Sequence, residues 1–244
     1  MVSRRYPKTT DSMGNCIQAY IPGSNPISRS TIINVNTQPL RDYDFPIVFL
    51  IGGPGSGKKT LCMKLAEKYG FLHILASEVI RQEIMTRTER AFTLARMMSQ
   101  GQLVPTDILV ELIAIKMLNN LYNKNGVILS GFPKRKEQCK SFDTAIRPPD
   151  IVLYLNVRNS VLSDRIMGRI ITTTERPMIS YEEIKNQIKE FHKRNRLVIK
   201  HYKERLINID GEFDAIKVYE DACNAIDNVL MKTSSTASSF QPNL

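Results

Sequence analysis

A glycine-rich segment that directly follows an apolar run constrains this chain more than any other part of its sequence. Ile47–Ile51 reads IVFLI, an apolar stretch typical of a parallel strand covered on both faces. The segment GGPGSGKKT follows at once over Gly52–Thr60. Such a loop, placed between a strand and a helix, presents backbone N–H groups to an anion, and its lysine reaches the outer phosphates of a nucleoside triphosphate. An ordinary glycine-rich turn is the alternative, but the order of strand, loop, lysine and helix favours a phosphate-binding loop.

The composition bounds the class of protein. The chain has 244 residues, of which 42% are hydrophobic, as in a soluble globular protein. No apolar run approaches the roughly 20 residues that span a bilayer, and the first residues lack the apolar stretch of a secretory signal. Cys16, Cys62, Cys139 and Cys223 are scattered, and the histidines also lack ligand spacing. We therefore expect reduced thiols, no structural metal and a cytoplasmic protein.

The net charge of +10 suits either nucleic acid or a site that neutralises several phosphates. The basic run Lys193, Arg194, Arg196 lies within a helical pattern, and we predict that it forms a solvated helix face. The chain has no RNA-binding aromatic motif and no Trp. We therefore do not expect nucleic acid to be a partner.

The chain reads as one domain with two polar ends. Residues 1–45 are rich in Pro, Ser and Asn, and residues 232–244 are similarly polar, so both are predicted to be disordered extensions. Between them, short apolar runs alternate with helical patterns over residues 46–231, which predicts a parallel sheet with helices on both faces. The predicted strands are Ile47–Ile51, Leu72–Leu75, Val127–Leu129, Ile151–Leu155 and Leu206–Ile209.

A long helix is predicted between the last two strands. Ser180 and Glu183 have the spacing of a capping box, which marks its first turn. Residues at helical spacing then form an apolar stripe that should face the core. The stripe consists of Ile184, Ile188, Phe191, Val198 and Tyr202.

Several motifs in one order give the chain a recognisable pattern, and roughly Phe45–Leu230 resembles the adenylate kinases of the short-lid cytosolic type. The combination of motifs is much more specific than any one of them. The motifs are GGPGSGK at Gly52–Lys58, KYGFLHI at Lys68–Ile74, GQLVP at Gly101–Pro105, GFP at Gly131–Pro133 and NIDG at Asn208–Gly211.

The resemblance implies an α/β fold with a P-loop, a five-stranded parallel sheet, a monophosphate-binding arm at about 76–107 and a short lid at about 168–179. It implies an ATP-dependent phosphoryl transfer to AMP that yields two ADP, with Mg²⁺ accompanying the nucleotide, in a monomer. Phosphoryl transfer of this kind depends on positioning the reactants and on offsetting negative charge.

The resemblance also assigns roles to individual residues. The arginines carry the weakest assignment, because a surface arginine is ordinarily a salt-bridge partner. Catalytic roles fall on Lys58, Arg169 and Arg176. The triphosphate side would be bound by Gly53, Pro54, Gly55, Ser56, Gly57, Lys58, Lys59, Thr60, Arg165 and Gly211. The AMP side would be bound by Ala76, Arg81, Gln102, Val104, Gly131, Lys134 and Gln138.

Several positions depart from the family pattern, including Ala76–Ser77 where the family has Thr-Gly and Glu78 where it has Asp. The family has Gly where this chain has Lys59, and Asp, which orders the waters around Mg²⁺, where this chain has Ser130. It has Arg at the positions of Lys134 and Gln187, so two planar guanidinium forks are lost. Because the changes concern the metal, the transferring group and AMP, a second hypothesis stands beside the kinase. It is a catalytically weak or inactive relative that binds nucleotide as a sensor or scaffold.

A short motif near the N-terminus raises a separate possibility. Met13-Gly14-Asn15-Cys16 would offer a myristoylation glycine beside a palmitoylation cysteine if translation began at Met13. Membrane contact is expected only in that case. The alternative is that Gly14 is an internal residue of the disordered extension.

Overall fold

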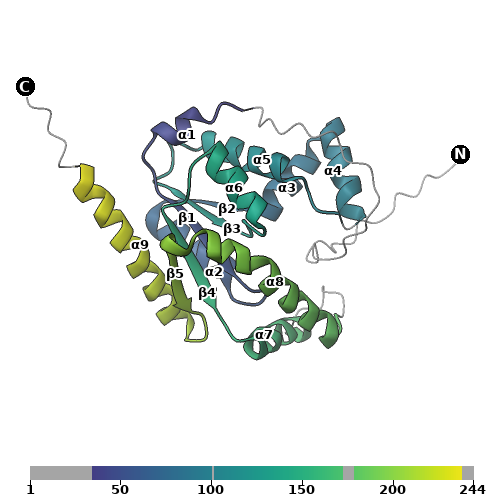
Figure 1. Cartoon of the computed structure of the whole chain (residues 1–244). Coiled ribbons are helices and arrows are strands. Elements are labelled where there is room, and N and C mark those ends of the chain that lie inside the picture. Colours follow the sequence, from purple (N-terminus) through teal and green to yellow (C-terminus); the bar gives the residue numbers. More distant parts are fainter. Residues whose placement is uncertain (1–34, 101, 173–178, 238–244) are drawn as a thin grey trace, which may run out of the picture.

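The computed structural model describes residues 35–100, 102–172 and 179–237, and it contains a five-stranded parallel sheet with helices on both faces (Figure 1). The strand order is β2-β3-β1-β4-β5. The predicted fold class is confirmed, and each predicted strand is found within one residue. The strands are β1 (Ile47–Gly52), β2 (Leu72–Leu75), β3 (Val127–Ser130), β4 (Ile151–Asn156) and β5 (Leu206–Asp210).

Strand β1 lies at the centre of the sheet and ends in the glycine-rich loop. Phe49 pairs in register with Leu129 of β3 on one side and with Val152 of β4 on the other. The chain leaves β1 toward β2 and β3 and later returns to β4 on its opposite side. This reversal places the loop at a topological switch point, at the carboxyl edge where ligands bind in open α/β sheets.

Alternate residues of β1 belong to two different cores. Ile47, Phe49 and Ile51 pack with α1, α3, α5, α6 and α8, whereas Val48 and Leu50 pack with α2 and α9. The helices are α1 (Gln38–Asp42), α2 (Lys58–Tyr69), α3 (Ala76–Met85), α4 (Glu89–Ser99), α5 (Thr106–Leu118), α6 (Lys136–Ala145), α7 (Asn159–Thr172), α8 (Tyr181–His201) and α9 (Ala215–Ala237).

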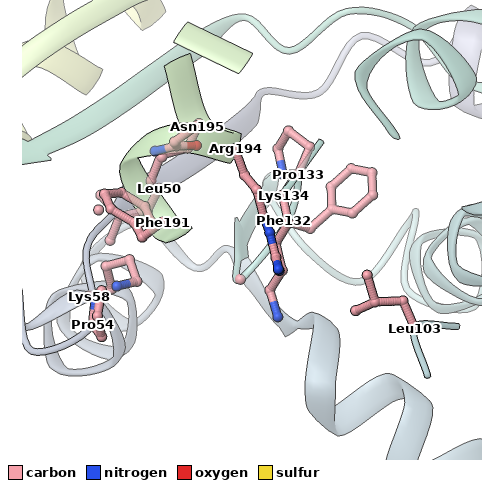
Figure 2. Close-up of a pocket in the computed structure, with 13 residues that line it drawn as sticks. Leu50, Pro54, Lys58, Leu103, Phe132, Pro133, Lys134, Phe191, Arg194 and Asn195 are labelled. Atoms are coloured by element: carbon pink, nitrogen blue, oxygen red, sulfur yellow. The ribbon is translucent and has the colours of Figure 1, made fainter. Parts of the chain in front are cut away.

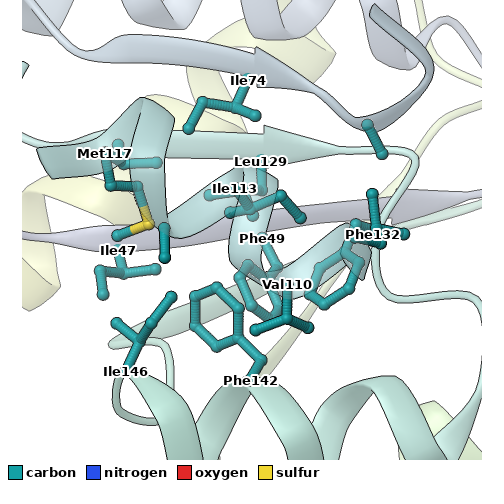
Figure 3. Packing of buried hydrophobic residues seen from close by; sticks show 14 of the residues in the cluster. Ile47, Phe49, Ile74, Val110, Ile113, Met117, Leu129, Phe132, Phe142 and Ile146 are labelled. Carbon is teal, nitrogen blue, oxygen red and sulfur yellow. The ribbon is translucent and has the colours of Figure 1, made fainter. Parts of the chain in front are cut away.

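In the larger core, aromatic side chains gather around Phe49, in the middle of β1 (Figure 3). The Phe49 ring meets the rings of Phe132, Phe142 and Tyr202 edge to face, with centroid separations of 5.8, 5.0 and 5.7 Å. Such pairs stabilise a core beyond the area that they bury. They also fix the segment after β3 and the end of α8 relative to β1, so the loops around the site share one rigid base.

The N-terminal boundary differs from the prediction. Residues 35–45 are not an extension, because α1 packs on the core and both Leu40 and Phe45 are buried. The Thr37 hydroxyl donates to the carbonyl of Ala145 at 2.5 Å, which ties this segment to the end of α6. At the other end, α9 continues to Ala237, beyond the predicted start of the tail at Lys232. Residues 1–34, with Met13–Cys16, lie outside the described residues.

The stretch predicted as the arm contains two helices, and part of the predicted lid lies outside the described residues. Helices α3 and α4 occupy the stretch between β2 and α5 that was predicted as the arm. The predicted lid begins at Gly168, which lies within α7, and residues 173–178 fall outside the described part of the chain.

Helix α8 begins as predicted, because the Ser180 and Glu183 side chains and backbones form a complete capping box. Four residues of the predicted stripe are buried and Phe191 is half-buried. The stripe also contains a polar residue, since Asn195 is buried on the same helix.

The described cysteines Cys62, Cys139 and Cys223 are buried free thiols. Burial raises the pKa of the Cys62 thiol to about 12, and it raises that of Cys139 to about 12 as well. No helix within the described ranges is both long and apolar enough to cross a membrane.

Candidate active site

The glycine-rich loop has a backbone that only glycine adopts readily. Gly55 and Gly57 have φ angles of 84° and 90°, in the left-handed region. A Cβ on Gly55 would also lie 2.9 Å from the carbonyl oxygen of Leu162, so α7 packs directly on the loop. Gly57 is the N-cap of α2 and supplies no side-chain cap. The first turn of α2 therefore keeps its backbone N–H groups and its positive dipole end available to an anion.

Lys58 lies across this loop. Its Nζ atom donates to the carbonyl oxygen of Gly53 at 2.5 Å and to the Ser56 hydroxyl at 3.2 Å. Burial lowers the pKa of Lys58 to about 8, and the positive charges of Lys134 and Arg169 add to this effect. A phosphate between these groups would supply the negative charge that the site lacks, and it would raise the pKa of Lys58 again.

One cavity of about 420 Å³ opens between the loop and α7, and we call it the α7 cavity. Arg165 donates from Nη1 to the carbonyl oxygen of Gly211 at 2.8 Å, which joins α7 to the segment after β5. Arg169 reaches the loop itself, since its Nη2 atom would be 3.5 Å from a Cβ on Gly55. The cavity is lined by Gly55, Ser56, Gly57, Thr60, Leu61, Lys64, Leu155, Arg165, Arg169, Gly211, Phe213, Ala215 and Val218.

A second cavity of about 240 Å³ is lined by Lys58, and we call it the α8 cavity (Figure 2). Its walls are the end of β1, the segment after β3 and helix α8. Three of its side chains carry positive charge: Lys58, Lys134 and Arg194. The cavity is lined by Leu50, Ile51, Gly52, Pro54, Lys58, Leu103, Gly131, Phe132, Pro133, Lys134, Phe191, Arg194 and Asn195.

The structure brings most predicted triphosphate residues together in the α7 cavity, with four exceptions, of which Lys58 lines only the α8 cavity. Pro54 lines the α8 cavity instead. Gly53 lines neither cavity but accepts a hydrogen bond from Lys58 through its carbonyl. Lys59 is exposed and also lines neither cavity. Arg176 falls outside the described residues.

The predicted AMP residues are less closely gathered. Gly131 and Lys134 line the α8 cavity, and Ala76 stands beside it, with its Cβ atom 3.9 Å from where a Cβ on Gly131 would be. Gln138 lies behind the cavity wall, where its Oε1 atom accepts from the Lys134 backbone N–H at 2.7 Å. We therefore see Gln138 as a support for Lys134 in this conformation.

The predicted arm contributes to the α8 cavity a residue other than those predicted. Leu103 lines the α8 cavity, whereas the predicted neighbours Gln102 and Val104 do not, and Val104 packs on the larger core. Arg81 forms an ion pair with Glu78 on its own helix and lines neither cavity. An AMP phosphate at Arg81 would therefore require the arm to move relative to the cavity.

The residues near the end of β3 do not fit a Mg²⁺ site that the protein itself holds. Ser130 is buried, carries no charge, and its Oγ atom is 3.0 Å from the His73 Nε2 atom. Burial lowers the pKa of His73, and the positive charge of Lys59 lowers it further. Among the described residues, no three His, Cys, Asp or Glu side chains gather as ligands would. A Mg²⁺ ion at this place would need ligands from the phosphates of a bound nucleotide.

Several residues that line the two cavities had no predicted role in the site. Lys193 and Arg196 are exposed as predicted, but Arg194 points to the cavity, so the run is not wholly a solvated face. Successive residues on a helix face different directions, which a charge run hides. Asn195 carried no signal, although a polar residue beside the apolar stripe could have provided one. Phe213 of the α7 cavity was also missed, two residues after the NIDG motif.

The chain also matches known proteins by sequence. The family model "Adenylate kinase" matches residues 50–207. Chicken adenylate kinase isoenzyme 1 is 31% identical over 199 residues, covering 80% of this chain and 100% of the relative. Mouse adenylate kinase isoenzyme 5 is 33% identical over 185 residues, covering 75% of this chain but only 33% of the relative, so the chain spans about a third of that protein. The chain belongs to the adenylate kinase family.

Proposed function

We propose that this chain is a nucleoside monophosphate kinase that transfers the γ-phosphoryl group of ATP to AMP. The observation that carries the proposal is a pair of cavities that both border one glycine-rich loop. Lys58 lines the α8 cavity and donates to Ser56, which lines the α7 cavity. Two nucleotides held in them would direct their phosphates toward the same ammonium group. Nucleoside monophosphate kinase activity at the level of the family supports this arrangement.

In the α7 cavity, the N–H groups at the start of α2 would hold the triphosphate, with Arg165 and Arg169 facing it from α7. AMP would enter the α8 cavity beside Gly131 and Lys134. An oxygen of the AMP phosphate then attacks the γ-phosphorus, and the bond from that phosphorus to the bridging oxygen of ADP breaks. The bridging oxygen keeps the electron pair, so two ADP molecules result. The protein positions the reactants and offsets their charge.

One specific observation favours a second candidate, a nucleotide-binding protein with little transfer activity. Ser130 has only a neutral hydroxyl, and that hydroxyl meets His73 at 3.0 Å. Lys134 and Gln187 lack the fork with which arginine grips phosphate oxygens at two points. Loss of one such arginine costs about 10³–10⁵ in rate in related phosphoryl-transfer enzymes.

A coupled assay for ADP formation from ATP and AMP, with and without Mg²⁺, tests the proposal. We expect ADP from the parent chain and none above background from Lys58→Ala. ATP binding in a calorimeter, measured in parallel, separates the candidates. Binding without ADP formation would overturn the kinase and leave the nucleotide-binding protein.

A further inference from the structure

Helix α8 carries a guanidinium group two turns away from the position where the family would have one. Gln187 and Arg194 are seven residues apart, so they lie on nearly the same face of the helix, about 10 Å apart along its axis. Arg194 reaches the α8 cavity, which also holds Lys58 and Lys134. Figure 2 shows Arg194 and Asn195 entering this cavity from α8 while Lys58 enters from the start of α2.

Arg194 has an alternative partner that a phosphate could displace. Its Nη2 atom lies 3.2 Å from the Glu190 Oε2 atom, and both side chains are partly exposed, at 31% and 40%. Exposed pairs of this kind contribute little to stability. A phosphate in the cavity carries more charge and would be shielded from water, so it would compete well for the same guanidinium.

Asn195 provides independent evidence for a ligand. Its side chain is only 3% exposed and lines the same cavity. Within the described part of the chain, its Nδ2 atom is buried with no hydrogen-bond partner. A buried donor without an acceptor is a cost to the folded state. An unsatisfied buried donor in a native structure calls for an explanation, and an acceptor from a bound ligand is one.

We propose that Arg194 and Asn195 form a phosphate-binding subsite of the α8 cavity, in which Arg194 serves where the family's arginine is replaced by Gln187. The ligand is a phosphate at the junction of the two nucleotides, with oxygens that accept from the Arg194 fork and from the Asn195 amide. This inference rests on the proposed function, since it assigns two further ligands to the same site.

The test measures the affinity of a linked compound, two adenosines joined by five phosphates, for the full chain by calorimetry. Arg194→Gln should weaken binding by about ten- to a hundredfold, the effect expected for charged hydrogen bonds. Arg196→Gln is the matched control, because Arg196 is exposed on the same helix, and it should leave the affinity unchanged. ATP alone, bound in the α7 cavity, should bind all three proteins equally.

A rescue experiment distinguishes replacement from general damage. Adding Gln187→Arg to the Arg194→Gln protein should restore affinity for the linked compound to within about threefold of the parent. A lost structural contact at Arg194 would not be restored from two turns away. Failure of the rescue would overturn the claim that Arg194 takes over the role of the missing arginine.

Asn195→Leu separates a ligand-binding role from a structural role, because the two roles predict opposite changes in the unfolding temperature. Leucine has similar branching and no unpaired donor, so the variant should unfold at a higher temperature than the parent chain. It should also bind the linked compound about two- to tenfold more weakly, as expected for a neutral hydrogen bond. A variant that unfolds at a lower temperature and binds normally would contradict the role of Asn195.

The possible failures are distinguishable. If the parent chain binds the linked compound no more tightly than ATP, the acceptor side is absent and the proposed function fails. If the parent chain binds it tightly and Arg194→Gln binds it equally well, the kinase proposal stands and only the phosphate subsite on α8 is overturned.

Discussion

The α7 and α8 cavities share one glycine-rich loop but are built from different parts of the chain. The α7 cavity offers a ligand mainly the backbone around Gly55 and Gly57, and it holds most of the predicted triphosphate residues. The α8 cavity offers side chains, and Lys134 there departs from the family pattern. A site made by backbone N–H groups persists while side chains change, whereas a site made by side chains can change its ligands one substitution at a time.

The largest expected effect is at Lys58. Lys58→Ala removes the ammonium that lines the α8 cavity and donates to Ser56 of the α7 cavity. It should weaken ATP binding by at least about 1.5–3 kcal/mol, the range for charged hydrogen bonds. Calorimetry measures the change. Lys68→Ala, at the last turn of the same helix, is the control and should bind ATP like the parent chain. If Lys58→Ala binds ATP as tightly as the parent chain, the proposal that this loop binds the ATP phosphates is wrong.

The next effect concerns the departures near β3. Changing Lys59→Gly and Ser130→Asp together would replace an ammonium and a neutral hydroxyl by the residues that the family has there. We expect ADP formation to rise at least about tenfold and to depend more strongly on Mg²⁺, since a carboxylate can order the waters of the ion.

Initial rates over a Mg²⁺ titration provide the measurement, with each single variant as a control. Should the double variant match the parent chain in both rate and metal dependence, the departures at these positions are neutral. The departures from the family pattern would then affect the ligands of the α8 cavity but not the rate of phosphoryl transfer.

A pH titration separates binding from stability. Because the folded pKa of Lys58 is lowered to about 8, the free protein loses this proton as the pH rises through about 8. ATP affinity should fall above that pH, by up to about tenfold per unit. The free energy of unfolding should rise with pH between about 8 and 10.5. In this range the Lys58 side chain keeps its proton in the unfolded chain but not in the folded chain.

Arginine at this position stays charged across the window, so Lys58→Arg is the matched control. Its ATP affinity should be flat between pH 8 and 10 once the titration of the nucleotide is subtracted. Calorimetry in two buffers of different ionisation enthalpy should also detect proton uptake on binding to the parent chain only. A parent chain whose affinity is equally flat would show that Lys58 keeps its proton.

The smallest expected effect refines the description of the α8 cavity. Glu190→Gln would release Arg194 from its ion pair, whose atoms are 3.2 Å apart. The linked compound should then bind about two- to fivefold more tightly, in line with the small contribution of partly exposed ion pairs. Arg194→Gln should abolish this gain. A gain that survives in the double variant would place the effect of Glu190 elsewhere.

The sequence predicted the sheet well because its signals are local. Each strand is a short apolar run, and the start of α8 is marked by the Ser180 and Glu183 side chains themselves. Helix α1 was missed because five residues that begin with Gln-Pro show no periodicity, and only the burial of Leu40 and Phe45 reveals their place.

The candidate site was predictable where a motif fixes the backbone and less so elsewhere. The glycine loop followed from its spacing alone. Arg194 could not be separated from its basic neighbours without knowing which face of α8 meets the cavity, and Arg81 carries an expected role that its pairing with Glu78 does not yet display. Those placements depend on how distant helices pack, which one sequence does not state.

The buried thiols can report how often the folded domain opens. A thiolate is the reactive form of cysteine, and the raised pKa values of Cys62 and Cys139, near 12, keep that form scarce while the domain is closed. A thiol-selective reagent therefore labels these positions only during transient opening. Cys62 lies one helical turn beyond Lys58, in the helix that begins at the loop. A nucleotide bound at the loop should therefore slow the labelling of Cys62 more than the labelling of Cys223 on α9.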